Sequence, residues 1–162
     1  MSIQTFTDLY HRTVEERPIL AVFLSGHLAI EYLLRKLITI YDPALGRIAD
    51  ELSHAKLLAL NADVGTITSK QREVLTRINK IRNRFAHEIL YEPTVDELRE
   101  LFDLAAAAFT DLTDGISQGV EELATCTDVR SLEDYVVHEL FIQICYDLHE
   151  EYITRGGDVD EF

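Results

Sequence analysis

A short segment near the middle of the chain carries an arginine, an asparagine and a histidine at a spacing suited to phosphate chemistry. Arg82 and Asn83 are adjacent, and His87 follows four residues after Asn83. A guanidinium can hold two phosphate oxygens at once, and an imidazole can accept or donate a proton near neutral pH. Such a set can hold an RNA phosphodiester, take the 2′-hydroxyl proton or protonate the leaving 5′-oxygen. The asparagine amide would orient the histidine or the phosphate.

These residues lie in the most basic segment of an acidic protein. The chain has 162 residues with 15 basic and 29 acidic side chains, a formal net charge of −14. Residues 1–87 hold 12 basic and 9 acidic side chains, whereas residues 88–162 hold 3 and 20. The whole-chain charge argues against promiscuous nucleic-acid binding, but the uneven distribution allows a local anion site. The basic residues of the segment are Lys70, Arg72, Arg77, Lys80, Arg82 and Arg84.

Two interpretations of this segment stay open at the level of sequence. The candidates for binding RNA or another anion are Arg77, Lys80 and Arg84. A basic run is equally typical of a solvated helix face. Arg82 lies on the flank of an apolar stripe, where it needs a carboxylate or must reach solvent, and Glu31 is the candidate supporting partner. In this structural interpretation, Arg82 pairs with Glu31 and so joins two helices, and His87 is a histidine that is hydrogen-bonded near a helix C-terminus.

Other kinds of chemistry find little support. His27 and Glu31 are one helical turn apart, as are Cys145 and His149, but neither pair has further ligands at recognisable spacing, so no metal or cofactor is expected. No Gly-rich phosphate loop or Gly-x-Ser-x-Gly elbow supports a kinase, dehydrogenase or esterase. Two cysteines, no leader segment and no bilayer-length apolar run predict a soluble cytoplasmic protein without membrane contact.

The elements that position these residues are expected to be helices only. Seven glycines and three prolines are few for the turns of a sandwich or barrel. The apolar periodicity predicts an up-and-down bundle of five to six helices in a single domain over residues 1–157, followed by an acidic, frayed tail at 158–162. The segment 19–41 is apolar on most of its circumference and should be the central helix. The expected helices span residues 3–16, 19–41, 48–60, 68–87, 94–120 and 131–155.

Sequence signals mark several helix ends. Thr68 or Ser69 can cap the fourth helix, whose apolar stripe continues to Ile89. The capping-box spacing of a hydroxyl and an acid three residues later opens the helices that begin near Thr94 and Ser131.

The segment Ile81-Arg82-Asn83-Arg84-Phe85-Ala86-His87 resembles the Arg-polar-x-x-x-His signature of the HEPN superfamily of helical nucleotide-binding domains. The similarity extends over about residues 19–105, including the stretches 26–34, 56–60 and 78–87, and there it looks like the mannitol-operon-repressor branch of bacterial proteins. The last helix lies outside the resemblance.

The resemblance implies a helical bundle and two alternative functions. Many HEPN proteins are metal-independent endoribonucleases, acting as toxins of toxin–antitoxin pairs or as antiviral defence effectors. They usually form homodimers in which two motifs line one cleft, so Arg82, Asn83 and His87 would be catalytic, with an antitoxin or regulatory protein as a further partner. The repressor-like branch includes non-enzymatic regulators, so the alternative is a binding or transcriptional-regulator module that acts through protein–protein contacts. Its acidic C-terminal half would then bind a basic partner through residues such as Glu121, Glu122, Glu133 and Asp134.

Overall fold

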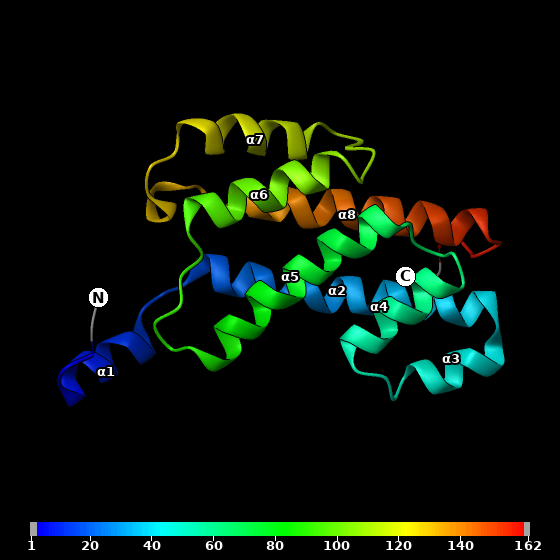
Figure 1. The fold of residues 1–162 in the computed structure, drawn as a ribbon, viewed down its shortest axis with the longest axis horizontal. Coiled ribbons are helices and arrows are strands. Elements are labelled where there is room, and N and C mark those ends of the chain that lie inside the picture. Colours follow the sequence, from blue (N-terminus) through cyan, green and yellow to red (C-terminus); the bar gives the residue numbers. More distant parts are fainter. Residues whose placement is uncertain (1–2, 161–162) are drawn as a thin grey trace.

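The computed structural model of the chain describes residues 3–160 and confirms the all-helical prediction. Within that part of the chain there are eight α-helices, one short 3-10 helix and no strand (Figure 1). The elements are α1 (Phe6–Val14), α2 (Pro18–Tyr41), α3 (Pro43–Ala49), α4 (His54–Asp63), α5 (Ser69–His87), α6 (Val95–Ala106), α7 (Gly115–Thr125), η1 (Val129–Ser131) and α8 (Asp134–Thr154).

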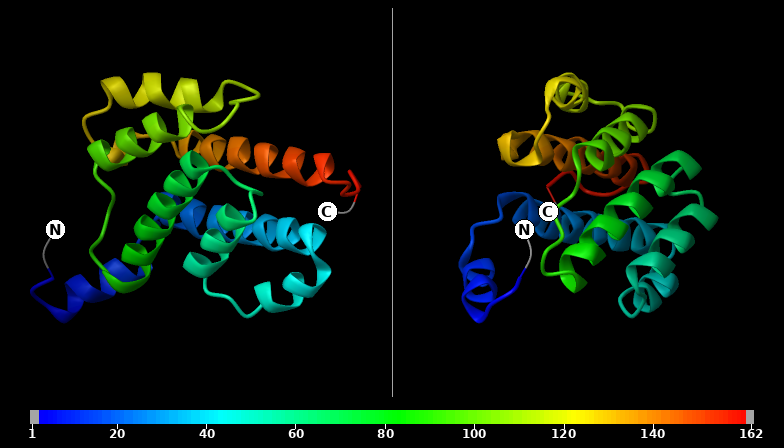
Figure 2. Two further views of the ribbon diagram at one scale, coloured as in Figure 1. Left: turned by 45° about the vertical axis from the view of Figure 1, so that its right-hand side comes forward. Right: turned by 60° about the vertical axis from the view of Figure 1, so that its left-hand side comes forward.

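The longest helices, α2 and α8, lie side by side and run in the same direction (Figure 1). Gly26 allows this close approach, because a Cβ at this position would lie 2.3 Å from the ring of Phe141. The successive helices α2, α5, α6, α7 and α8 alternate in direction, which gives an up-and-down bundle with α3 and α4 inserted between α2 and α5 (Figures 1 and 2).

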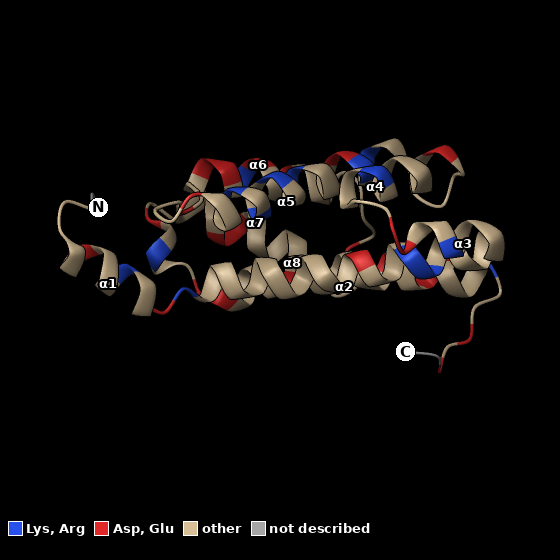
Figure 3. Ribbon diagram, turned by 90° about the horizontal axis from the view of Figure 1, so that it is seen from below, with Lys and Arg blue, Asp and Glu red and all other residues tan. Residues whose placement is uncertain are grey.

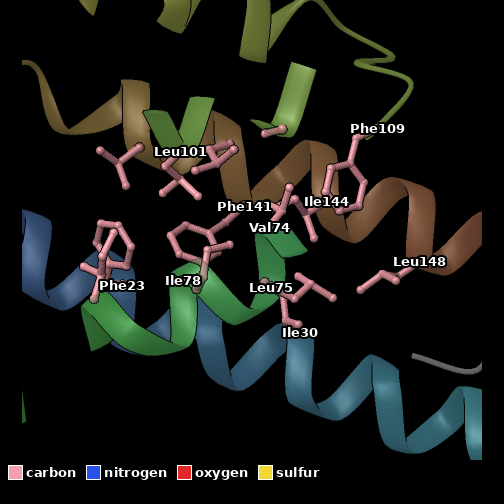
Figure 4. Packing of buried hydrophobic residues seen from close by; sticks show 14 of the residues in the cluster. Phe23, Ile30, Val74, Leu75, Ile78, Leu101, Phe109, Phe141, Ile144 and Leu148 are labelled. Carbon is pink, nitrogen blue, oxygen red and sulfur yellow. The ribbon is translucent and has the colours of Figure 1, made fainter. Parts of the chain in front are cut away.

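The core is one continuous cluster that joins α2, α5, α6 and α8 (Figure 4). Phe23 of α2 is fully buried and meets the ring of Phe141 edge-on, with the centroids 5.3 Å apart. The stripe predicted on α5 is buried as far as Phe85 but not at Ile89, which is exposed because α5 ends two residues earlier. The central position predicted for residues 19–41 is confirmed, since ten residues of α2 are buried.

By length and composition, α2 is the one helix of the described residues that could cross a membrane. Its burial among α4, α5 and α8 instead identifies it as the core helix of the bundle. A location in the cytoplasm stays a prediction.

The described residues form eight α-helices instead of the five to six expected, and α3 and α7 account for the difference. The helix predicted over 94–120 is two helices, α6 and α7, because the chain reverses at Asp111 and Asp114, which both have positive φ. In place of the helix expected over 48–60, the chain forms the short α3, which Asp42 caps by accepting a hydrogen bond from the N–H of Ala44, and then α4, which begins only at His54.

The helix caps are predicted correctly in two cases of three. Thr68 and Thr94 both form capping boxes, at the start of α5 and α6. The capping box expected at Ser131 is wrong, because that residue ends η1 and α8 begins after Glu133, with no side-chain cap.

The first and last described segments of the chain are largely exposed. Helix α1 projects beyond the bundle, and its Phe6, Tyr10 and Val14 are exposed (Figure 1). The predicted acidic tail is exposed at residues 158–160, and residues 161–162 lie outside the described part of the chain.

Candidate functional site

Arg82 and Asn83 lie on α5, and Arg82 is close to His27 of α2 and His54 of α4. Arg82 is half-buried, and its Nη1 donates a hydrogen bond to Oδ1 of Asn83 at 3.1 Å. The ion pair with Glu31 is not found, and Arg82 pairs with no carboxylate among residues 3–160. Among the described residues, Arg82 therefore does not join two helices through Glu31, which was its expected structural role.

His87 is the last residue of α5 and is exposed. The helix is regular up to this residue, since the N–H of Glu88 still bonds to the carbonyl of Arg84. Five residues along a regular helix correspond to a rise of about 7.5 Å and a rotation of about 140°. Arg82 and His87 of one chain therefore point to different sides of α5, so a single chain does not bring them onto one phosphate.

The candidate anion-binding residues divide into two groups. Arg77 forms an ion pair with Glu100 of α6. Arg84 bonds to Glu88 at 3.0 Å and to Glu97 at 2.9 Å, and its guanidinium lies 3.9 Å from the ring centroid of Tyr91. Figure 3 shows basic residues of α5 close to acidic residues of α6. Arg77 and Arg84 are thus each paired with carboxylates of the same chain.

Lys80 is exposed and has no carboxylate partner among the described residues. It lines an open groove of about 410 Å³ together with Arg72, Arg77 and Glu100. This groove faces α6, whereas Arg82 is close to α2 and α4. The two sets of residues therefore do not form one continuous basic surface on a single chain.

Glu31 is the centre of a different polar cluster. Its Oε1 accepts a hydrogen bond from Arg35 at 2.6 Å, and its Oε2 lies 3.3 Å from Nδ1 of His54 at the start of α4. Arg35 also donates to the carbonyl of Ala49, which ties α2 to α3. Burial by itself would raise the pKa of Glu31, but the hydrogen bonds from Arg35 and His54 lower it below its ordinary value.

His27 completes the cluster from one turn earlier on α2. Its ring packs against that of His54, with centroids 4.1 Å apart and planes inclined by 36°. The Nε2 of His27 lies 3.3 Å from Oδ1 of Asn79 on α5. The cluster thus joins α2, α4 and α5 at one point, and Arg82 is close enough to act electrostatically on both imidazoles.

Both imidazoles of the cluster favour the neutral state. Burial lowers the pKa of His54 to about 4, and the neighbouring His27 contributes to the shift. Burial also lowers the pKa of His27. Two neutral histidines beside a carboxylate at neutral pH are able to act as ligands or as hydrogen-bond partners.

Sequence reasoning identified His27 and Glu31 as neighbours but did not find His54 or Asn79. His54 is 23 residues from Glu31, and nothing in the local pattern indicates that α4 packs back onto α2. The only sequence signal for His54 and Asn79 is that they are polar residues in expected helices. Many surface residues share this property, so it does not single them out.

Comparisons with family models, curated proteins and solved structures find no significant match to this chain.

Proposed function

We propose that this protein is a HEPN-type endoribonuclease that cleaves RNA without a metal ion, using Arg82, Asn83 and His87 in the cleft of a homodimer. The observation that carries the proposal is the state of Arg82, which has no carboxylate partner among the described residues of a protein rich in acid. A guanidinium held by an asparagine and free of carboxylates can receive a phosphate.

In the proposed dimer, the second protomer brings a histidine to the phosphate that Arg82 holds. Because Arg82 and His87 point to different sides of α5, a phosphate held by Arg82 of one protomer would meet His87 of its partner. His87 is exposed at the end of its helix, so it is accessible to a second protomer. In this arrangement His87 takes the 2′-hydroxyl proton or protonates the leaving 5′-oxygen, and Arg82 stabilises the charge that develops on the phosphate. The products are a 2′,3′-cyclic phosphate and a 5′-hydroxyl.

The test is cleavage of single-stranded RNA by the purified protein in EDTA. We expect cleavage with cyclic-phosphate ends, and a loss of about 100-fold or more in Arg82→Ala and in His87→Ala. Lys70→Ala is the matched control, since Lys70 is an exposed cation about 18 Å away on the same helix. Equal background activity in all four proteins would refute the proposal.

A mixing experiment tests the shared cleft. When Arg82→Ala and His87→Ala chains are combined, each mixed dimer contains one protomer with Arg82 and one with His87. We expect partial recovery of activity on mixing, together with a dimer mass in solution. A monomer with no recovery would contradict the dimer.

One observation favours a non-enzymatic binding module instead. The ion pairs of Arg77 and Arg84 with Glu100 and Glu97 of α6 leave less positive charge for RNA, while residues 88–162 carry 20 acidic side chains. Such a module would show no turnover and would bind a basic partner, an antitoxin or a regulatory protein. Loss of that binding on neutralising the exposed acids Glu121, Glu133 and Asp134 would support this second function, and unchanged binding would refute it.

A further inference from the structure

We propose that His27, Glu31 and His54 form a binding site for a divalent transition-metal ion such as Zn²⁺. One ligand atom of each residue lies within 4.8 Å of the other two. Two imidazole nitrogens and one carboxylate oxygen form a set that zinc accepts readily, with a water as the fourth ligand. The site lies between α2 and α4, and none of its three ligands is a proposed catalytic residue of the ribonuclease.

The hydrogen bonds leave unpartnered nitrogens in the cluster. The amide Oδ1 of Asn79 can only accept, so Nε2 of His27 donates to it and Nδ1 carries the lone pair. This Nδ1 and the Nε2 of His54 are buried and have no hydrogen-bond partner among the described residues. A buried polar atom without a partner costs about 1–3 kcal/mol. A metal ion bound to Nδ1 of His27 removes that cost.

The distances fit an ion after a small movement. Ligands at about 2.0–2.2 Å on a tetrahedral zinc ion are separated from each other by about 3.4 Å. Nδ1 of His54 and Oε2 of Glu31 are already 3.3 Å apart. Nδ1 now donates its proton to Glu31, so on binding an ion His54 must adopt its other neutral tautomer, with the proton on Nε2. The ligand nitrogen of His27 lies within 4.8 Å of the other two ligand atoms. Because the His27 ring is stacked on that of His54, the ring must rotate to bring this nitrogen to the tetrahedral separation of about 3.4 Å. We expect this adjustment to involve side chains rather than the backbone of α2 and α4.

Outer contacts already orient two of the three ligands. Asn79 holds the Nε2 side of His27, and Arg35 holds the second oxygen of Glu31 at 2.6 Å. Such partners fix the direction of a ligand's lone pair and the tautomer of a histidine. The Glu31 side chain is 24% exposed, which gives an ion and its water access from solvent.

Arg82 opposes the ion. Its guanidinium acts electrostatically on both histidines, so a bound cation is less stable while Arg82 is present. Nitrogen ligands nevertheless select Zn²⁺, Co²⁺ or Ni²⁺ over Mg²⁺, which prefers oxygen. The site is therefore expected to bind a transition metal and to ignore Mg²⁺.

The test is titration of EDTA-treated, dialysed full-length protein, purified without a metal-affinity tag, with Co²⁺ as a spectroscopic probe and Zn²⁺ as competitor. We expect one Co²⁺ per chain, a tetrahedral visible absorption that Zn²⁺ abolishes, and a higher Tm with Zn²⁺ but not with Mg²⁺. His27→Gln and His54→Gln should each weaken binding about 100-fold or more. His138→Gln, an exposed histidine of α8, is the matched control.

Further variants keep the result interpretable. Glu31→Gln preserves the side-chain shape, and Asn79→Ala removes only an outer contact, for which we expect a 10–100-fold weaker affinity. Arg82→Ala should bind Co²⁺ more tightly, although the same change should abolish RNA cleavage, so the two proposals can fail separately. Co²⁺ uptake that is equal in the wild type, His27→Gln and His54→Gln, or no uptake by a folded wild type, would overturn the metal site.

Discussion

The imidazoles of His27 on α2 and His54 on α4 stack with their centroids 4.1 Å apart. Their side chains come from helices that are separated by 12 residues of α3 and its flanking turns, and Glu31 lies beside His54. Two imidazolium cations at this distance would repel each other strongly in a partly buried site. The contact therefore requires that at least one ring is neutral in the folded protein.

The first prediction concerns the pH dependence of stability. Because burial lowers the pKa of His54 in the folded state to about 4, the unfolded chain binds a proton more readily between pH 6.5 and pH 4. The free energy of unfolding therefore has its full value above pH 6.5 and decreases as the pH falls from 6.5 to 4. From pH 7.5 to pH 5 the free energy of unfolding should fall by about 2 kcal/mol from this group.

The measurement is urea unfolding in a metal-free buffer at both pH values. In His54→Gln, which cannot take up this proton, the fall between pH 7.5 and pH 5 should be smaller by that amount. His138→Gln should retain the wild-type dependence. Equal slopes in the wild type and His54→Gln would contradict the assignment.

The second prediction concerns the attachment of α1. Arg12 is buried, bonds to the carbonyl of Ile89 at 2.9 Å and pairs with Glu15 and Glu92, each at 2.6 Å. Phe6, Tyr10 and Val14 of α1 are exposed, so we expect Arg12 to supply much of the attachment of α1 to the bundle. Arg12→Ala should cost about 2–3 kcal/mol and release α1.

Amide hydrogen exchange checks this result. In Arg12→Ala, the amides of α1 should exchange at the rate of an unfolded segment while those of α2 stay protected. Arg12→Lys retains the positive charge, so the protection of its α1 amides should lie between that of the wild type and that of Arg12→Ala. Unchanged protection of α1 in Arg12→Ala would show that other contacts hold it.

The third prediction concerns the contact between α2 and α8. A Cβ on Gly26 would lie 2.3 Å from the Phe141 ring, so the ring or the helix must move. Gly26→Ala should lower the free energy of unfolding by about 1–2 kcal/mol, because the overpacking exceeds the gain in helix propensity. Thermal unfolding measures this, with the exposed Ser25→Ala as control, for which a change within about 0.5 kcal/mol is expected. A stabilised Gly26→Ala would mean that the helices separate easily.

The fourth prediction compares two aspartates with positive φ. Asp111 has φ 53° and accepts hydrogen bonds from the N–H groups of Ile116 and Ser117, whereas Asp114 has φ 60° and its side chain caps nothing. Replacing either by glycine relieves the same backbone strain. Asp111→Gly should therefore be less stable than Asp114→Gly by at least about 1 kcal/mol, the value of a lost helix cap. Equal stabilities by urea unfolding would refute the role of Asp111.

Features that depend only on residues close together in the sequence could be predicted from it. The burial of Val74, Ile78, Ile81 and Phe85 follows from their helical spacing, and the capping box at Thr94 follows from the glutamate three residues later. The division of residues 94–120 into two helices could not, because the reversal depends on Asp111 and Asp114 adopting a conformation that aspartate seldom adopts.

The sequence by itself determined an all-helical protein, a buried α2 and an α5 rich in basic residues, because periodicity, composition and capping are local properties. Only the tertiary structure decided which charges meet. It paired Arg77 and Arg84 with acids of α6 and of the turn between α5 and α6, left Arg82 without a carboxylate among the described residues, and brought His54 against His27. These contacts depend on how helices distant in the chain pack, and the packing is set by the whole apolar core rather than by the polar residues it brings together.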